Sequence, residues 1–292
     1  MTGDTLSGIL QERVFTLTLV ILSSSLSTVH ATVTEVFTEA ATADVELVAL
    51  AMAIGAVVLG AVLRARHIHR AGGTLVSALG FALALVVLAV AVRSNGWLLA
   101  GDGPVTRWFV SHRTSILNEL AIAVTTAGGP PETAAVGVLA AVALIWRTKR
   151  YGPALIMLAT VATASILCTV IKLVVGRGRP PLQLQLMLET DHSFPSGHVT
   201  GATTLLMMLA LVLGARRSTG LHVLLVAVAV AGATLVAVTR LYLGVHWLTD
   251  VCAGALLAAL MVTLGGYALH LLDTRVAEQR YSSALTTSKV SL

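Results

Sequence analysis

Long apolar stretches recur along this chain of 292 residues, and they limit its fold more than any other feature of the sequence. A helix of about 20 residues spans the hydrocarbon core of a bilayer. Seven stretches come near that length, namely residues 47–63, 75–92, 133–146, 153–175, 199–213, 221–239 and 249–272. Only 11% of the residues are charged, whereas about a quarter are charged in soluble domains. The sequence therefore predicts an all-α fold, a polytopic membrane helix bundle.

The two ends of the chain fall outside this pattern. Residues 14–33 form an eighth candidate helix, although several Ser and Thr residues lower its hydrophobicity. Its first part, 14–31, is either a membrane helix or a signal peptide, and the single Arg before it favours an uncleaved helix. We therefore expect an N-terminal extension (1–70) with one or two membrane helices, a core (71–272), and a polar cytoplasmic tail (273–292) that is loosely ordered.

Lys and Arg gather in alternate loops, and this asymmetry predicts the orientation of the chain. One side receives the basic residues of 64–70, 147–150, 216–217 and 275–289, so we expect this side to be cytoplasmic. The opposite side receives the acidic stretch 35–46, the loops 93–132 and 176–198, and the short link 240–247. The chain is thus expected to be a multi-pass protein of the cell membrane.

The overall charge and the cysteines exclude other classes of protein. The net charge is +5, but the basic residues are scattered between apolar stretches, which is not typical of nucleic-acid binding. Anionic lipid is the expected partner. Cys168 and Cys252 lie inside apolar stretches, so we expect small core residues rather than a disulfide or a zinc site. The sequence does not indicate an oligomeric state.

Four cations lie on the outer side, where the positive-inside rule predicts few basic residues. Lys172 lies near the outer end of stretch 153–175, Arg177 and Arg179 follow it, and Arg240 begins the last outer link. Charged groups at membrane depth are costly and indicate function, although a side chain that reaches to the interface is the simpler explanation for any single one. The four together indicate a site for an anion.

Two further patterns lie on the same side. Pro195-Ser196-Gly197-His198 precedes an apolar stretch, so Ser196 is predicted to be an N-cap, and the backbone N–H groups of the helix start would bind an anion. His246 and Asp250 are four residues apart, which places them on one helix face. A carboxylate bonded to one ring nitrogen leaves the other nitrogen free as a base or nucleophile.

These residues form three motifs, Lys172-x6-Arg179-Pro180, Pro195-Ser196-Gly197-His198 and Arg240-x5-His246-x3-Asp250. In order, spacing and separation by apolar helices they resemble the signature motifs of the type-2 phosphatidic acid phosphatase superfamily, which shares its active site with vanadium haloperoxidases. The third motif usually begins Ser-Arg, whereas this chain has Thr239-Arg240 and keeps the hydroxyl. The resemblance covers about residues 75–271 and implies a six-helix phosphatase core, to which the helix at 47–63 is an addition.

The resemblance also implies roles for these residues in a metal-independent phosphoric ester or diphosphate hydrolase. His246 would attack phosphorus and form a phosphohistidine, Asp250 would orient it, and His198 would protonate the leaving oxygen and later activate water. The phosphate-binding residues would be Lys172, Arg179, Ser196, Gly197 and Arg240. No cofactor or metal is expected, because the outer loops hold cations rather than a carboxylate cluster suited to magnesium. Arg177 either contacts a second phosphate or faces water, and Asp102 is expected to form a turn.

A lipid substrate follows from the position of the motifs at helix ends. The scissile phosphate would lie at headgroup depth while an acyl or prenyl chain stays in the hydrocarbon. Polyprenyl diphosphate is the first choice by analogy, followed by phosphatidylglycerol phosphate and phosphatidic acid. The alternatives are a phosphatase for a soluble sugar phosphate and a non-catalytic lipid-binding or transport protein on the same scaffold, although the latter has no need of His198 or His246.

Overall fold

The computed structural model describes residues 43–66, 70–215 and 217–290, and every regular element in these ranges is a helix. The α-helices are α2 (Ala43–Ala65), α3 (Arg70–Ser94), α4 (Asp102–Ser111), α5 (Ser115–Ala127), α6 (Pro130–Thr148), α7 (Tyr151–Val175), α8 (Gly197–Gly214), α9 (Thr219–Tyr242) and α10 (Leu248–Val290). Two short 3-10 helices, η1 (Trp97–Gly101) and η2 (Leu182–Leu184), lie in the connections. The predicted all-α fold is confirmed, and the candidate helix at 14–33 lies outside the described residues.

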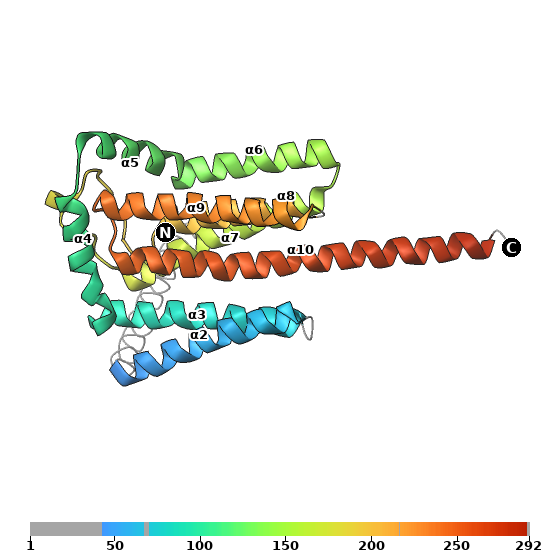
Figure 1. Cartoon of the computed structure of the whole chain (residues 1–292), viewed down its shortest axis with the longest axis horizontal. Helices are drawn as coiled ribbons and strands as arrows, with labels where there is room; N and C mark the ends of the chain where they lie inside the picture. The colour runs from blue at the N-terminus through green and yellow to red at the C-terminus, as the bar shows by residue number, and fades with distance from the viewer. Residues whose placement is uncertain (1–42, 67–69, 216, 291–292) are drawn as a thin grey trace, which may run out of the picture.

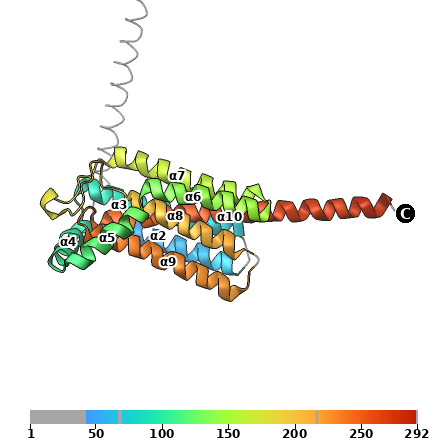
Figure 2. The same ribbon diagram turned by 90° about the horizontal axis from the view of Figure 1, so that it is seen from above.

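The long helices lie side by side and form an elongated bundle (Figures 1 and 2). Helix α8 packs against α6, α7, α9 and α10, while α3 lies between α10 and α2. Helix α4 runs across one end of the bundle, and the connection between α7 and α8 lies at that same end (Figure 1). Each of the seven apolar stretches falls within one long helix.

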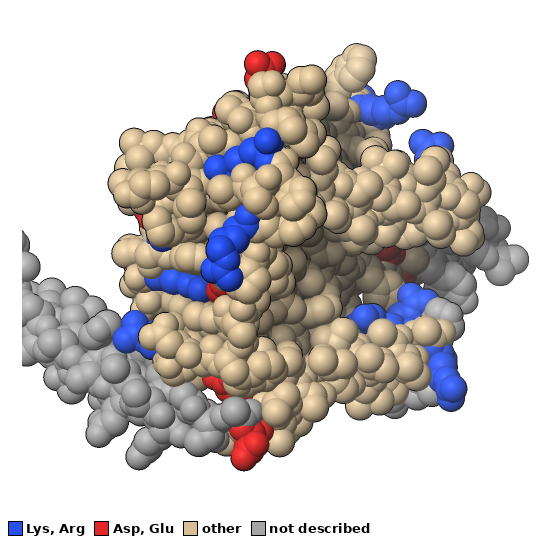
Figure 3. Space-filling view, turned by 60° about the vertical axis from the view of Figure 1, so that its left-hand side comes forward, with Lys and Arg blue, Asp and Glu red and all other residues tan. Residues whose placement is uncertain are grey.

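Six of these helices are long and apolar enough to cross a membrane, namely α2, α3, α7, α8, α9 and α10. Helices α5 and α6 pass the same test only as a pair, bent by 52° at the break between them. Many large apolar side chains on the outside of the bundle are exposed, such as Leu79, Leu139 and Leu173. A surface of this kind is stable against lipid tails, and Figure 3 shows that its charged side chains gather in two bands with a mostly uncharged region between them.

The core of the bundle contains four apolar clusters, and the two largest lie between the long helices. One lies between α3, α7 and α10 and includes Phe194 from the connection before α8. The other lies between α6, α7 and α8 and includes Met157 and Met208, which are fully buried. Small residues let the helices approach closely, since a Cβ on Gly254 of α10 would lie only 2.8 Å from the Ser196 carbonyl oxygen at the start of α8.

The segment 93–132, expected to be a loop, is mostly helical. Helix α5 begins where Thr114 caps it, its hydroxyl accepting a hydrogen bond from the Leu117 N–H at 3.3 Å. Helix α4 packs Val105 and Phe109 against the cluster that contains Leu241. A side-chain cap stabilises α5 and an apolar side stabilises α4, and a search for membrane-length stretches detects neither feature.

Two other expectations also need correction. The tail from residue 273, expected to be loosely ordered, is helical as far as the described residues reach, because α10 continues to Val290. The sequence after Gly266 contains neither Gly nor Pro, so nothing interrupts the helix. Cys168 is buried as expected, but Cys252 is exposed on the outer side of α10 rather than in the core, and both thiols are free.

Candidate active site

The three sequence motifs meet at the end of the bundle that α4 crosses. Lys172 lies in the last turn of α7, His198 in the first turn of α8, and Asp250 in the first turn of α10, with His246 in the link between α9 and α10. One pocket of about 540 Å³ is lined by residues of all three motifs together with the loop before α8, namely Lys172, Arg179, Glu189, Asp191, Gly197, His198 and His246. The bundle thus brings together side chains that are up to 74 positions apart (246 − 172).

The imidazole of His246 is held between a cation and a carboxylate. An Arg179 nitrogen lies 3.2 Å from Nε2, and because a guanidinium can only donate, Nε2 accepts and the ring proton is assigned to Nδ1. Nδ1 lies 3.4 Å from Oδ2 of Asp250, within the distance of an ion pair but without the alignment of a hydrogen bond. Burial, together with the charges of Arg240 and Arg179, lowers the pKa of His246 well below its ordinary value. The ring is therefore neutral at pH 7, with the lone pair of Nε2 directed toward Arg179.

Asp250 is supported by residues that the sequence did not connect with it. Its Oδ2 accepts the Trp247 N–H at 2.9 Å, and its Oδ1 accepts a hydrogen bond from Arg177 at 2.6 Å. The other Arg177 nitrogen donates to Asp102 at 2.6 Å, and Asp102 also accepts the Thr249 N–H at 2.9 Å and the Thr249 hydroxyl at 2.8 Å. All three charged side chains are almost completely buried.

This arrangement corrects the sequence interpretation of two residues. Arg177 is neither on the water-facing surface nor free for a second phosphate, because it bridges Asp102 and Asp250. Asp102 is not a simple turn residue, since it begins α4 and ties that helix to the start of α10. Asp102 lies 148 positions before Asp250 (250 − 102), and no local pattern in the sequence indicates that the two share a cation.

The cations of the pocket are paired with two carboxylates from the loop before α8. Asp191 lies 2.9 Å from Lys172 and 2.5 Å from Arg179, and Glu189 bonds Arg240 and lies 3.6 Å from Arg179. Burial alone would raise the pKa of Asp191, but the bonds and charges of Lys172 and Arg179 bring it to about 2. Burial acts against Glu189 in the same way, and Arg240 and Arg179 lower its pKa below the ordinary value. Sequence reasoning missed both acids, although their position beside the second motif offered a signal.

Ser196 and Arg240 are completely buried, whereas the other phosphate-binding candidates, Lys172, Arg179 and Gly197, are partly exposed. Ser196 is the N-cap residue of α8, as expected, but its hydroxyl does not cap the helix, and Oγ is buried with no hydrogen-bond partner among the described residues. Arg240 is fully buried, donates to the Thr125 hydroxyl at 2.7 Å, and reaches the pocket only through its bond to Glu189. A buried hydroxyl without a partner is costly, so Ser196 offers a donor that a bound anion would satisfy.

The described residues contain no group of three or more His, Cys, Asp or Glu that could hold a metal ion. Apart from the two carboxylates paired with its cations, the site consists of cations, imidazoles and hydroxyls around one pocket. Such groups stabilise negative charge on oxygen. The expectation that catalysis needs no metal stays a prediction.

Comparisons with known proteins point to one family. The model of the PAP2 superfamily matches residues 153–272. The chain is 30% identical to phosphatidylglycerophosphatase B of Bacillus subtilis (strain 168) over 185 residues, which are 62% of this chain and 89% of that protein. It is 34% identical to undecaprenyl-diphosphatase of Sulfolobus acidocaldarius over 125 residues, which are 39% of this chain and 52% of that protein. The crystal structure of a transmembrane PAP2 type phosphatidylglycerolphosphate phosphatase from Bacillus subtilis superposes with a TM-score of 0.60 at 28% identity and covers 64% of this chain and 93% of that one.

The fold and these matches define a class of protein, a multi-pass membrane enzyme that hydrolyses phosphoric esters. Within that class, this chain belongs to the PAP2 superfamily. The matched segment 153–272 contains all three motifs, so the family resemblance and the pocket involve the same residues.

Proposed function

We propose that this protein is a lipid phosphatase that works through a phosphohistidine, with its site on the outer face of the cell membrane. The observation that carries the proposal is a neutral, buried imidazole, His246, whose Nε2 lies 3.2 Å from an Arg179 nitrogen in a pocket lined by cations. An unprotonated imidazole nitrogen is suited to attack on phosphorus once Arg179 turns from Nε2 to the phosphate.

In the first step, Nε2 of His246 attacks phosphorus and the bond from phosphorus to the leaving oxygen breaks. The leaving oxygen takes a proton from His198, which lines the same pocket. As the P–N bond forms, the imidazole becomes positively charged, and Asp250 at 3.4 Å stabilises that charge. Arg177 and Asp102 keep the Asp250 carboxylate in place.

In the second step, His198 takes a proton from a water molecule, whose oxygen attacks phosphorus on the phosphohistidine. The P–N bond breaks, its electrons return to Nε2 of His246, and inorganic phosphate is released. Lys172 and Arg179 would bind the non-bridging oxygens in both steps, together with the Ser196 hydroxyl, the Gly197 N–H and Arg240. The carboxylates of Glu189 and Asp191 form ion pairs with the three cations, so a phosphate would have to displace these carboxylates.

The shape of the pocket favours a lipid over a soluble sugar phosphate. Besides the motif residues, the pocket is lined by Ser165, Thr169 and Leu173, which lie on the exposed side of α7. These residues follow the helix for about 12 Å at 1.5 Å per residue, into a segment that is apolar enough to cross a membrane. An opening along this side would admit a lipid chain from the bilayer while the phosphate lies among the cations.

Two lipids are the first to test. Polyprenyl diphosphate remains the first choice by analogy, and the undecaprenyl-diphosphatase relative supports it. Phosphatidylglycerol phosphate has support from a relative that covers more of this chain. Phosphatidic acid is the third candidate. The pocket volume of about 540 Å³ accommodates either one or two phosphates, so the headgroup must be decided by measurement.

The substrate test is phosphate release by the purified protein in detergent. We would compare polyprenyl diphosphate, phosphatidylglycerol phosphate, phosphatidic acid and a sugar phosphate at equal concentration, with a chelator present throughout. We expect turnover of at least one lipid and little of the sugar phosphate. Turnover of the sugar phosphate alone would refute the lipid substrate, and no turnover of any of the four would refute the proposed activity.

The nucleophile is tested by His246→Ala, with His222→Ala at the other end of the bundle as the matched control. We expect the first variant to fold and lose turnover, and the second to retain it. Vanadate, which mimics pentacoordinate phosphorus, should inhibit the wild-type protein. Robust turnover by His246→Ala would remove the assigned nucleophile.

The side of the membrane is tested by labelling single cysteines in intact cells with a membrane-impermeant maleimide. Gln183 is exposed near the candidate site, and Thr274 is exposed toward the other end of the bundle. In a Cys252→Ser background, we expect Gln183→Cys to react in intact cells and Thr274→Cys to react only after lysis. The reverse pattern would place the site on the cytoplasmic face.

A further inference from the structure

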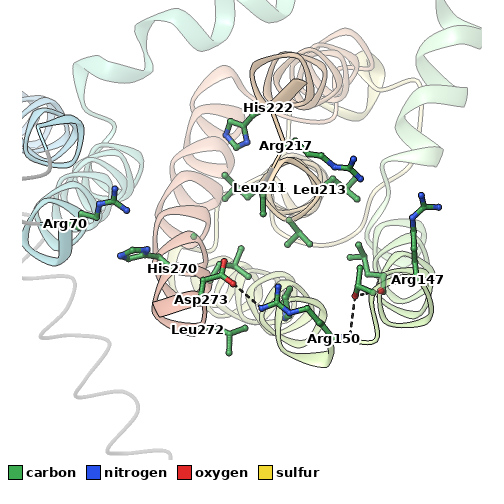
Figure 4. Close-up of a pocket in the computed structure, with 17 residues that line it drawn as sticks. Arg70, Arg147, Arg150, Leu211, Leu213, Arg217, His222, His270, Leu272 and Asp273 are labelled. Carbon is green, nitrogen blue, oxygen red and sulfur yellow. Dashed lines mark hydrogen bonds and ion pairs between the residues drawn. The ribbon is translucent and has the colours of Figure 1, made fainter. Parts of the chain in front are cut away.

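A second cavity lies at the end of the bundle opposite the candidate active site. Its volume is about 780 Å³, and it is lined mainly by residues of α6, α8 and α10, together with single residues of α3, α7 and α9 and of the connections before α7 and α9 (Figure 4). It contains none of the motif residues, so the proposed phosphatase chemistry does not account for it.

Arginines from separate parts of the chain surround this cavity. Arg147 lies in the last turn of α6, and Arg70 lies at the start of α3. Arg150 precedes α7 and Arg217 precedes α9. The only carboxylate that lines the cavity within the described ranges is Asp273, which lies 3.1 Å from Arg150 (Figure 4). With four arginines and one carboxylate, the lining carries a formal charge of +3 (4 − 1) when its histidines are neutral.

Two of these arginines are available to a ligand. Both Arg147 and Arg217 are exposed, and neither side chain has an ion pair or a hydrogen bond within the part of the chain that the structure describes. The positive-inside rule explains why arginines occur at this end of the helices, but it does not explain why they surround a hollow. A guanidinium can donate two parallel hydrogen bonds to two oxygens of one phosphate.

The walls of the cavity are apolar. Leu144, Leu211, Leu213, Leu269 and Leu272 contribute to them, and these residues lie in the last turns of helices α6, α8 and of the apolar part of α10. A free phosphate ion would gain nothing from leucine side chains. A molecule with an anionic head and a hydrocarbon chain would match both the arginines and the leucines.

We propose that this cavity binds one anionic phospholipid, whose phosphodiester contacts Arg147 and Arg217 and whose acyl chain lies against the leucines. The lipid occupies the membrane leaflet opposite the candidate active site. Its binding does not depend on the proposed phosphatase function, because no motif residue takes part. Charge complementarity selects an anionic over a zwitterionic lipid, and the apolar wall selects a lipid over free phosphate.

The test is native mass spectrometry of the full chain in detergent, titrated with phosphatidylglycerol or with phosphatidylcholine of the same acyl chains. We expect the wild-type protein to bind phosphatidylglycerol at least about tenfold more tightly, since phosphatidylcholine keeps the phosphodiester but adds a quaternary ammonium that the arginines around the cavity repel. The variant Arg147→Gln/Arg217→Gln should lose this preference. The control Arg66→Gln/Arg275→Gln removes two exposed charges outside the cavity and should keep it.

Each outcome decides the proposal. If both double variants lost binding equally, only the total positive charge at this end of the bundle would matter. That result would overturn the proposal. Displacement of the bound lipid by inorganic phosphate at the concentration of the lipid would show a simple anion site, and would also overturn it. If the double variant does not fold, the single variants Arg147→Gln and Arg217→Gln, each at an exposed position, are expected to weaken binding separately, and no weakening in either would refute the site.

Discussion

Replacing Arg177 by Gln removes the cation that joins Asp102 to Asp250. Arg177 donates to Asp250 and to Asp102, in both cases at 2.6 Å. The side chains of Arg177, Asp102 and Asp250 are 10%, 6% and 0% exposed, so water cannot take over these bonds. Gln carries no charge and cannot reach both carboxylates, so two buried negative charges remain without compensation.

The magnitude follows from this burial. Removing one partner of a buried ion pair costs about 3–5 kcal/mol, because the remaining charge stays desolvated. The matched control is Arg107→Gln, which removes an exposed arginine from α4 at the same end of the bundle. For a surface change of this kind we expect a difference within about 0.5 kcal/mol. The free energy of unfolding would be measured for both variants by denaturant titration in the same detergent.

The same substitution should also reduce turnover. Without Arg177, the Asp250 carboxylate loses the charged donor to Oδ1 and keeps the Trp247 N–H on Oδ2, so it can move away from His246. A displacement of about 1 Å at such a site can cost about 100-fold in rate. We expect kcat to fall far more than KM changes, because Arg177 positions the nucleophile through Asp250 and does not bind substrate.

Arg177→Lys separates charge from geometry. It restores one positive charge, but a single ammonium does not form the two-pronged bridge of a guanidinium. We therefore expect it to recover part of the stability and little of the rate. The reasoning would be refuted if Arg177→Gln were as stable as Arg107→Gln and turned over at the wild-type rate.

Three more outcomes follow from the structure. The lowered pKa of His246 keeps the nucleophile neutral until the pH falls through that pKa, so the acid limb of kcat/KM should have its midpoint below the ordinary value of 6.5; a midpoint above 6.5 would contradict the assignment. Glu189→Gln removes a carboxylate that competes with phosphate for the cations, and the inhibition constant of inorganic phosphate should fall about tenfold; an unchanged constant would show that Glu189 does not compete. Gly254→Ala places a methyl group 2.8 Å from the Ser196 carbonyl oxygen and should lower the free energy of unfolding by about 1–3 kcal/mol. Gly55→Ala is the control, because its methyl group meets nothing within 4 Å. Equal melting temperatures for the two variants would refute the close packing of α8 and α10.

The paired carboxylates also affect how the candidate site is used. Asp191 and Glu189 form ion pairs with Lys172, Arg179 and Arg240. Clustered cations without counter-ions repel one another, and the acids remove that cost. A phosphate that enters exchanges one set of ion pairs for another, so the affinity of the site depends on these acids as well as on the cations.

The sequence determined the helices that cross the membrane and the residue types available for chemistry. Stretches such as 75–92 and 221–239 form helices because a backbone in lipid must satisfy its own hydrogen bonds. This constraint acts within one segment, and so it can be read from consecutive residues. The motifs around Lys172, His198 and His246 could be identified in the same way, by local spacing and by their position at helix ends.

Only the tertiary structure decided which of these residues act on one another. Arg177 has two carboxylate partners, and one of them, Asp102, is distant in sequence and lies in a segment that hydropathy treats as a loop. The hydroxyl of Ser196 and the guanidinium of Arg240 became deeply buried, which their positions in the motifs did not indicate. Hydropathy and helix propensity depend on neighbours along the chain, whereas burial and ion pairing depend on which helix ends pack together in space.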